Sequence, residues 1–184
     1  MLLDAERAQL LIVDIQDRLQ PHIHDGDGVV RNTGILLEAA RTLGIPVTVS
    51  EQYRKGLGLT VTALRTKLEE SEIFEKIHFS CAADDAIARH LRHLETSMGR
   101  DQIVICGTEA HICVLQSALG FHEAGHNVAV VMDAVGSRRA QSRDLAMTRL
   151  SRHGLETVNT EMALFEWLKQ AGTDDFRRLS KLIK

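Results

Sequence analysis

The chain has 184 residues, which is enough for one domain spanning residues 1–184 with a full hydrophobic core. A formal net charge of −3 gives no reason to expect nucleic acid or an anionic membrane as a partner. The N-terminus lacks the apolar core of a signal peptide, and no apolar run is long enough to span a bilayer. Three cysteines are too few for a secreted disulfide framework, so we expect a soluble, cytoplasmic protein with reduced thiols.

Apolar runs alternate with helical patterns along the first half of the chain. Strands are predicted at 9–13, 45–50 and 73–79, the last as a short strand or extended segment. Helices are predicted at 29–43, 61–70 and 84–96. Asp27 and Asp84 are expected to cap the first and third of these helices, and Gly44 is expected to end the first.

The same alternation continues in the second half. Strands are predicted at 102–106, 127–132 and 154–158, and helices at 115–124, 141–153 and 161–170. Such alternation implies right-handed βαβ crossovers. We therefore expect a three-layer α/β/α fold with a central, mostly parallel, Rossmann-like sheet of about six strands and helices on both faces. Only the basic tail, residues 172–184, differs in composition from the rest.

The most informative stretch runs from Gly107 to Val114. It joins the apolar strand at 102–106 to the helix at 115–124, so Cys113 is placed where a strand ends and a helix begins. Ligands bind at this edge of open α/β sheets. The free amides and the dipole at a helix N-terminus favour negative charge. We therefore expect Cys113 to tend toward the thiolate and to act as a nucleophile.

Other strand ends carry groups that could assist a thiol. Asp14 follows the first strand, and Lys76 lies in the extended segment before the Cys113 strand. An aspartate can take the thiol proton and later return it to a leaving group. A nearby ammonium favours both ionised partners, and backbone amides at a helix start can hold an oxyanion.

Three segments resemble the isochorismatase-like cysteine hydrolase family, in the order Asp, Lys, Cys. They are LLIVDIQDRL around Asp14, IFEKIHFSC around Lys76, and VICGTEAHICVLQSALGFHEAGHNVAVVMDAVGSR around Cys113. The resemblance covers about residues 10–166, and EQYRKGLG at 51–58 is similar to the branch of isochorismatase domain-containing proteins and YcaC-like hydrolases. It implies Asp14 as general base, Lys76 as electrostatic partner and Cys113 as nucleophile.

The resemblance also implies an oxyanion hole and a reaction. The oxyanion donors would be the backbone N–H groups of Glu109 and Cys113, with a cis peptide bond between Thr108 and Glu109. The implied reaction is attack of the thiolate on a carbonyl, loss of an amine and hydrolysis of the thioester. Cys113 argues against isochorismate as the substrate and for a small amide-like compound with a C–N bond.

Two further expectations follow from the resemblance. Residues 50–55 lack the Asp-x-His segment of the nicotinamidase branch, so we expect no metal and no cofactor. The family forms dimers and larger assemblies, so we expect a homo-oligomer. Its contacts are expected to involve the tail residues Phe176, Leu179, Leu182 and Ile183.

Some assignments stay open at this point. Candidates for the substrate pocket are Gln16, Leu19, Tyr53, Phe79 and His111. For Gln16 and Glu109 a structural hydrogen bond is equally consistent, and His111 is as well explained as a loop histidine. Cys106 is expected in the core.

Other motifs have a simpler explanation than a binding site. Cys81 is expected to be partly buried at the start of a helix. The loop 21–28, with two histidines, is better explained as a polar loop than as a metal site. Arg138 and Arg139 would fit a phosphate or RNA contact, but the net charge favours surface solubility or a subunit contact.

Two other functions remain alternatives to the hydrolase. The first is a non-catalytic, oligomeric ligand-binding or interaction module of the same fold. The second is a redox-responsive thiol protein in which peroxide oxidises Cys113 reversibly. Neither alternative requires acyl transfer, so a covalent acyl adduct on Cys113 would discriminate the hydrolase from both.

Overall fold

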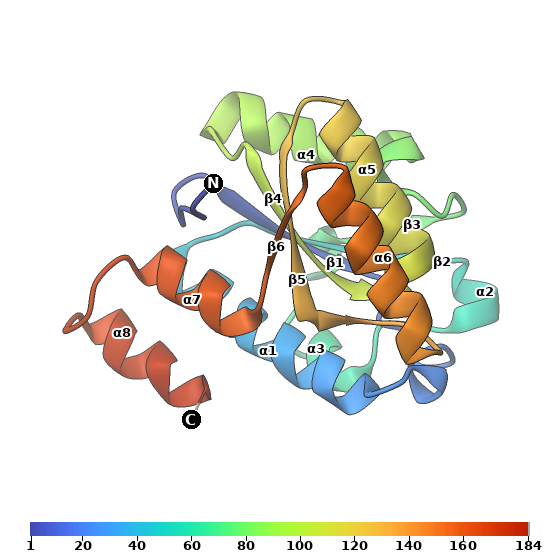
Figure 1. Ribbon diagram of the computed structural model, residues 1–184, viewed down its shortest axis with the longest axis horizontal. Helices are drawn as coiled ribbons and strands as arrows, with labels where there is room; N and C mark the ends of the chain where they lie inside the picture. The colour runs from blue at the N-terminus through green and yellow to red at the C-terminus, as the bar shows by residue number, and fades with distance from the viewer. Residues whose placement is uncertain (184) are drawn as a thin grey trace.

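The computed structural model describes residues 1–183, with a six-stranded sheet at its centre (Figure 1). All neighbouring strands pair in parallel, in the order β3-β2-β1-β4-β5-β6. The predicted three-layer α/β architecture is confirmed. The strands are β1 Ala8–Val13, β2 Val47–Gln52, β3 Ile73–Lys76, β4 Gln102–Thr108, β5 Asn127–Gly136 and β6 Glu156–Val158.

Helices cover both faces of the sheet (Figure 1). One face carries α1 Gly26–Leu43, α7 Thr160–Leu168 and α8 Asp174–Leu179, and the other carries α4 Asp85–Met98, α5 Leu115–Glu123 and α6 Ala140–Arg152. The remaining helical segments are short: α2 Arg54–Leu57, α3 Thr62–Arg65, the 3₁₀ turns η1 Gln20–His22, η2 Glu70–Glu72, η3 Cys81–Ala83 and η5 Ser180–Ile183, and the π-helical turn η4 Ala110–Val114. Within residues 1–183, no helix combines the length and apolar character needed to cross a membrane.

The central strands are buried on both faces, as their continuous apolar runs predict. Along β1, Leu10 and Ile12 belong to the core under α1 and α7, whereas Leu11 and Val13 belong to the core under α4, α5 and α6. Gly107 in β4 has φ 120°, and a Cβ there would lie 2.0 Å from the carbonyl oxygen of Val13. Only glycine fits this approach, which brings the ends of β1 and β4 together.

Two local predictions are wrong. A single helix over 61–70 does not form, because α3 covers only Thr62–Arg65 and η2 follows at Glu70–Glu72. This short segment is held instead by tertiary contacts, such as the hydrogen bond from Val61 N to Ile15 O. Asp27 does not cap α1 either, since the helix begins at Gly26 and its N-cap position is Asp25.

The other two predicted helix ends are confirmed. The Asp84 carboxylate accepts hydrogen bonds from Ala86 N and Ile87 N at the start of α4. Gly44 follows α1 with φ 68°, the left-handed conformation that glycine adopts without strain.

The tail packs on its own chain. Leu179 is fully buried in the core, the rings of Phe176 and Phe165 lie 6.2 Å apart, and Arg178 forms an ion pair with Glu38 of α1. The expectation that Leu179 contacts another subunit is therefore wrong, because α8 folds back and buries it. Leu182 stays 38% exposed, and Lys184, the last residue of the predicted tail, lies outside the described residues.

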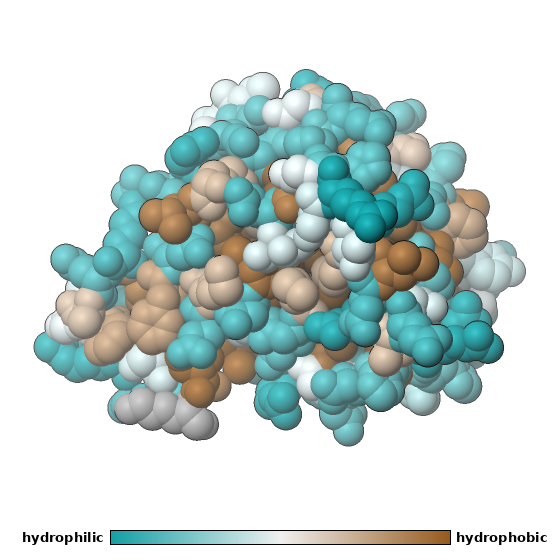
Figure 2. All heavy atoms as spheres, viewed as in Figure 1, coloured by the Kyte–Doolittle hydropathy of each residue, from teal (hydrophilic) through white to brown (hydrophobic). Residues whose placement is uncertain are grey.

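Apolar side chains also gather at the surface around α7 and the N-terminal segment (Figure 2). Leu2, Met162 and Phe165 are exposed there and line a groove of about 650 Å³.

Candidate active site

Asp14 follows the last residue of β1 and is fully buried. Its φ of 51° is left-handed, a conformation that aspartate tolerates better than most residues. The backbone is held by hydrogen bonds from Asp14 N to Ser50 O, at 3.0 Å, and from Thr108 Oγ1 to Asp14 O, at 2.7 Å. These contacts join the ends of β1, β2 and β4 at the position of the carboxylate.

Lys76, the last residue of β3, reaches the same carboxylate. Its ammonium donates to Asp14 Oδ2 at 2.7 Å, to Gln52 Oε1 at 2.6 Å and to Phe79 O at 3.2 Å. The side chain is 1% exposed. Because an ammonium has three N–H donors, these contacts satisfy it completely. Lys76 therefore stays a fixed buried cation beside Asp14.

Cys113 lies in η4 and is 7% exposed. The thiol is close enough to Asp14 and Lys76 for all three groups to shift one another's pKa. Burial, followed by the negative charge of Asp14, raises the pKa of the Cys113 thiol, although Lys76 opposes this effect. The direction of this shift opposes the expected tendency toward thiolate, because burial and a neighbouring carboxylate both disfavour the charged form of a thiol.

The Asp14 carboxylate is placed to accept a proton. Burial raises its pKa, while the Lys76 ammonium and the Ser50 hydroxyl act in the opposite direction. Burial acts to lower the pKa of Lys76, but the charge of Asp14 and its hydrogen bond, together with the two neighbouring cysteines, raise it overall. The resting cluster thus pairs an ammonium with a carboxylate of increased basicity and a neutral thiol.

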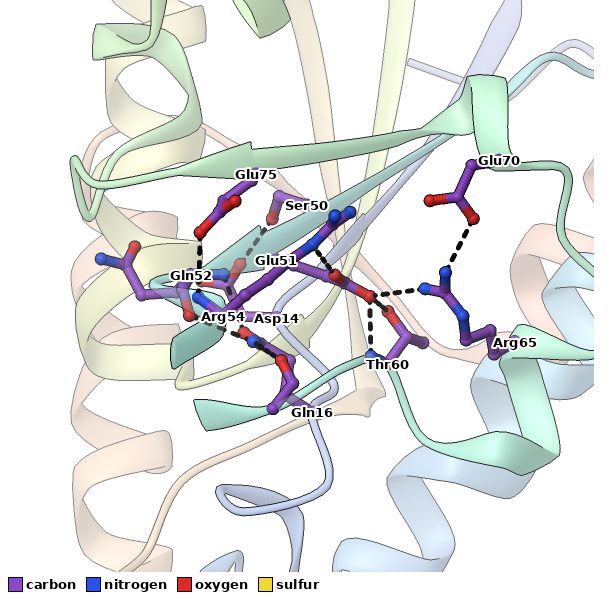
Figure 3. Close-up of polar contacts among 11 residues, drawn as sticks. Asp14, Gln16, Ser50, Glu51, Gln52, Arg54, Thr60, Arg65, Glu70 and Glu75 are labelled. Atoms are coloured by element: carbon purple, nitrogen blue, oxygen red, sulfur yellow. Dashed lines mark hydrogen bonds and ion pairs between the residues drawn. The ribbon is translucent and has the colours of Figure 1, made fainter. Parts of the chain in front are cut away.

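Two further partners of this cluster lie on β2: Ser50, which the sequence did not single out, and Gln52, a polar residue at a strand end to which it assigned no role. Ser50 Oγ donates to Asp14 Oδ1 at 2.6 Å (Figure 3). Gln52 Oε1 accepts from Lys76. Both side chains are buried and lie two residues apart, on one face of the strand. Two polar residues on the same face of a buried strand are the signal that could have identified them.

The other two cysteines differ from Cys113. Cys81 is fully buried rather than partly buried, and its thiol donates to Ser50 Oγ at 3.5 Å. Burial raises the pKa of Cys81 to about 11. Cys106 is fully buried, as predicted, and burial raises its pKa to about 12.

Glu109 connects η4 to the loop after β5. The Thr108–Glu109 peptide bond is cis, as predicted. Glu109 Oε2 accepts hydrogen bonds from Arg138 N, at 2.9 Å, and from Arg138 Nε, at 3.1 Å. The Glu109 carboxylate thus makes structural hydrogen bonds, which is one of the two roles that the sequence allowed for it. The backbone N–H of Glu109 makes no hydrogen bond within residues 1–183, so it is free to donate to a bound group.

A second buried carboxylate lies one strand away (Figure 3). Glu51 Oε1 accepts from Thr60 N and Thr60 Oγ1, both at 2.7 Å, and from Arg65 at 3.0 Å. Glu51 Oε2 accepts from Arg54 Nε. Despite burial, the hydrogen bonds from Thr60 and the charge of Arg54 lower the pKa of Glu51. No group of three metal-binding side chains occurs in the part of the chain that the structure describes.

The predicted pocket residues occupy different environments. Gln16 is fully buried. Its side-chain amide accepts a hydrogen bond from Gln52 N and donates to Gln52 O and Gly58 O, which is the structural role that the sequence left open for it. Leu19 packs against the core under α1. Tyr53 and Phe79 are 52% and 55% exposed, and His111 Nδ1 lies 3.0 Å from Ser137 Oγ.

Comparison with known protein families supports the resemblance noted in the sequence. Residues 8–162 match the model of the isochorismatase domain. A secreted isochorismatase effector, Isc1, from Phytophthora sojae is 34% identical over 179 residues, which are 95% of this chain and 83% of the relative. Isochorismatase domain-containing protein 2 of Danio rerio is 35% identical over 182 residues, 98% of this chain and 89% of the relative.

Solved structures agree with the fold. A MAR1 ribonuclease from Caenorhabditis elegans superposes with a TM-score of 0.90 at 31% identity, covering 100% of this chain and 92% of the other. The Escherichia coli YcaC gene product, described as an octameric hydrolase of unknown specificity, has a TM-score of 0.90 at 22% identity. That match covers 99% of this chain and 90% of the other.

Proposed function

This chain belongs to the isochorismatase family of hydrolases, and on that premise we propose that it is a metal-independent cysteine hydrolase of a small amide-like substrate. One observation carries the proposal. A neutral thiol, Cys113, lies beside a buried carboxylate, Asp14, that is paired with a buried ammonium, Lys76. A nucleophile next to a base, with the base oriented by a third group, is the arrangement that activates weak nucleophiles.

The first half of the reaction forms a thioester. Cys113 Sγ attacks the substrate carbonyl while the thiol proton moves to Asp14. The N–H groups of Glu109 and Cys113 stabilise the oxyanion, a contribution of roughly 2.7–4 kcal/mol per donor in known cases. Asp14 then gives the proton to the nitrogen, the C–N bond breaks, and the amine leaves.

The second half restores the enzyme. Water attacks the thioester carbonyl while Asp14 takes a proton from it. The C–S bond breaks, the acid product leaves, and Cys113 recovers its proton from Asp14. Lys76 keeps its charge throughout and holds the carboxylate in place. A raised thiol pKa agrees with this scheme, because proton transfer then accompanies attack rather than preceding it.

The substitution Cys113→Ala tests the proposal. We expect it to lower turnover of a hydrolysed amide at least ~10³-fold, because the nucleophile is lost. Intact-mass spectrometry of the unmodified protein should show an acyl adduct on Cys113. Cys106→Ala serves as the matched control and should keep turnover. Comparable activity of Cys113→Ala would overturn the proposal. Ligand binding without turnover by the unmodified protein would favour a ligand-binding module, and peroxide-dependent sulfenate without acyl transfer would indicate a redox role.

RNA hydrolysis is a second candidate, because the relative from Caenorhabditis elegans is named a ribonuclease. The net charge of the chain predicted that nucleic acid is not a partner. The name of this relative leaves that prediction without support. RNA cleavage by the purified chain that persists in Cys113→Ala would favour this candidate. Cleavage that copurification controls trace to a contaminant would remove it.

We also propose a homo-oligomer and a cytoplasmic location. The octameric assembly of YcaC from Escherichia coli and the apolar groove beside α7 support self-association. The relative from Phytophthora sojae is described as secreted, so location needs its own measurement. Light scattering of the purified chain would give the oligomer size, and fractionation of the source cells would give the compartment.

A further inference from the structure

A pocket of about 330 Å³ lies beside the loop that carries Cys113, and the mechanism above does not use it. The pocket is lined by His111, Arg138, Arg139 and Ser142. Two of these side chains are permanently cationic, a third can be protonated, and none is acidic. The lining thus has the charge and the donors of a site for an anion.

The pocket is attached to the proposed catalytic loop at two points. His111 belongs to η4 and stands two residues before Cys113. Arg138 donates from its backbone N and from Nε to Glu109 Oε2, and Glu109 supplies one of the proposed oxyanion donors. The pocket therefore shares part of its wall with the segment that carries Cys113.

The cationic charge of the pocket is only partly neutralised. Glu109 balances Arg138, whose terminal nitrogens remain without a partner in residues 1–183. Within the same described range, neither the Arg139 guanidinium nor the Ser142 hydroxyl makes a hydrogen bond or ion pair. One unpaired positive charge and several unused donors thus line this cavity.

We propose that this pocket binds an anionic group, a carboxylate or a phosphate, on the substrate whose carbonyl carbon Cys113 attacks. This inference rests on the proposed hydrolase function and names the substrate class. The planar guanidinium of Arg139 matches either anion with two parallel hydrogen bonds. The volume lies at the low end of small-molecule sites, which suits a compact metabolite.

The same chemistry would accept a phosphate of RNA, but the surroundings favour a small molecule. Nucleic-acid binding draws most of its affinity from many phosphate contacts along an extended basic surface. This chain has a formal net charge of −3, and Glu109 already pairs with one of the two arginines. The experiment must therefore distinguish binding of RNA from binding of a small anionic molecule.

Turnover of matched amides tests the pocket. Succinamate, 3-phosphonopropanamide and butyramide share a primary amide, but only the first two end in an anion. The wild-type chain should prefer an anionic amide over butyramide at least tenfold in kcat/KM, as expected for a charge-assisted contact. The better of the two anionic amides identifies the carboxylate or the phosphate. Arg139→Gln should raise KM for the anionic amides and so remove the preference, while kcat/KM for butyramide should stay unchanged.

Arg152→Gln, which changes an exposed arginine at the opposite end of α6 from Arg139, is the matched control and should keep the preference. A preference that survives Arg139→Gln, or no preference in the wild-type chain, overturns the proposal.

Binding without turnover separates this proposal from the hydrolase function. Calorimetry on Cys113→Ser protein should show succinamate or 3-phosphonopropanamide binding that weakens about tenfold in Cys113→Ser/Arg139→Gln. If that difference in affinity is found while no amide is turned over, the anion-binding proposal is supported and the proposed hydrolase function is wrong. Equal affinities in the two proteins, or binding of a short single-stranded RNA alone, overturn the pocket.

Discussion

Asp14 and Glu51 are two buried carboxylates at the ends of neighbouring strands, yet their proton affinities are displaced in opposite directions. Both side chains are fully buried, and both contact cations. The pKa of Asp14 is raised, whereas that of Glu51 is lowered. Burial raises the pKa in both cases, so the difference comes from the donors around each carboxylate.

The donor sets explain the difference. Glu51 accepts four hydrogen bonds, two from Thr60 and one each from Arg54 and Arg65, so its anion is fully solvated by the protein. Asp14 accepts one from Lys76 and one from Ser50, and the remaining neighbour is the Cys113 thiol. A carboxylate with a weaker donor set can exchange a proton. Glu51 is therefore held as an anion, whereas Asp14 has the raised pKa that suits the general base we propose.

The largest expected effect is on turnover. Asp14→Asn should lower kcat/KM about 10²–10⁴-fold, because it removes the proposed general base, whereas Glu51→Gln should change it little. Asp14→Asn also leaves the Lys76 ammonium buried without a counter-ion, which costs about 3–5 kcal/mol of stability. The double variant Asp14→Asn/Lys76→Met removes that charge. If it folds like the wild-type chain, as judged by circular dichroism and denaturation, and still turns over substrate, Asp14 is not the base.

The next effect concerns stability in acid. The pKa of Glu51 is lowered from its ordinary value of 4.5, so its ionised form stabilises the fold above that pH. This stabilisation is lost as pH falls through the folded-state pKa. Glu51→Gln should lower the free energy of unfolding at pH 7 by about 1–3 kcal/mol and flatten its decline below pH 4.5. Urea unfolding across this pH range measures both, and an unchanged acid decline would show that Glu51 contributes nothing to it.

The smallest effect concerns thiol reactivity. Because the pKa of Cys113 is raised, iodoacetamide should label it at least tenfold more slowly at pH 8 than it labels the same cysteine in the urea-unfolded chain, where the pKa is about 8.5. Peptide mass spectrometry reads out each cysteine separately. Labelling of native Cys113 well below pH 8.5 would show a preformed thiolate, and would contradict the assignment of Asp14 as the group that takes the thiol proton.

Patterns along the chain predicted much of the fold. The apolar runs 9–13 and 102–106 correspond to β1 and β4, because strands buried on both faces need continuous apolar residues. The predicted helix over 61–70 did not form, since it lies beside Glu51 and is shaped by contacts to residues distant in sequence. Asp14, Lys76 and Cys113 were identified by motif, but no role was assigned to Ser50 or Gln52, because their roles depend on which strand lies beside which.

By itself, the sequence determined the α/β class, the positions of most strands and the three residues that meet at the sheet edge. Local periodicity and short motifs are enough for these, because they depend on residues close together in the chain. Only the tertiary structure decided the proton affinities at that edge. They depend on burial and on donors such as Ser50 and Thr60, which come from other strands and loops. The fold thus raises the pKa of one buried carboxylate and lowers that of its neighbour.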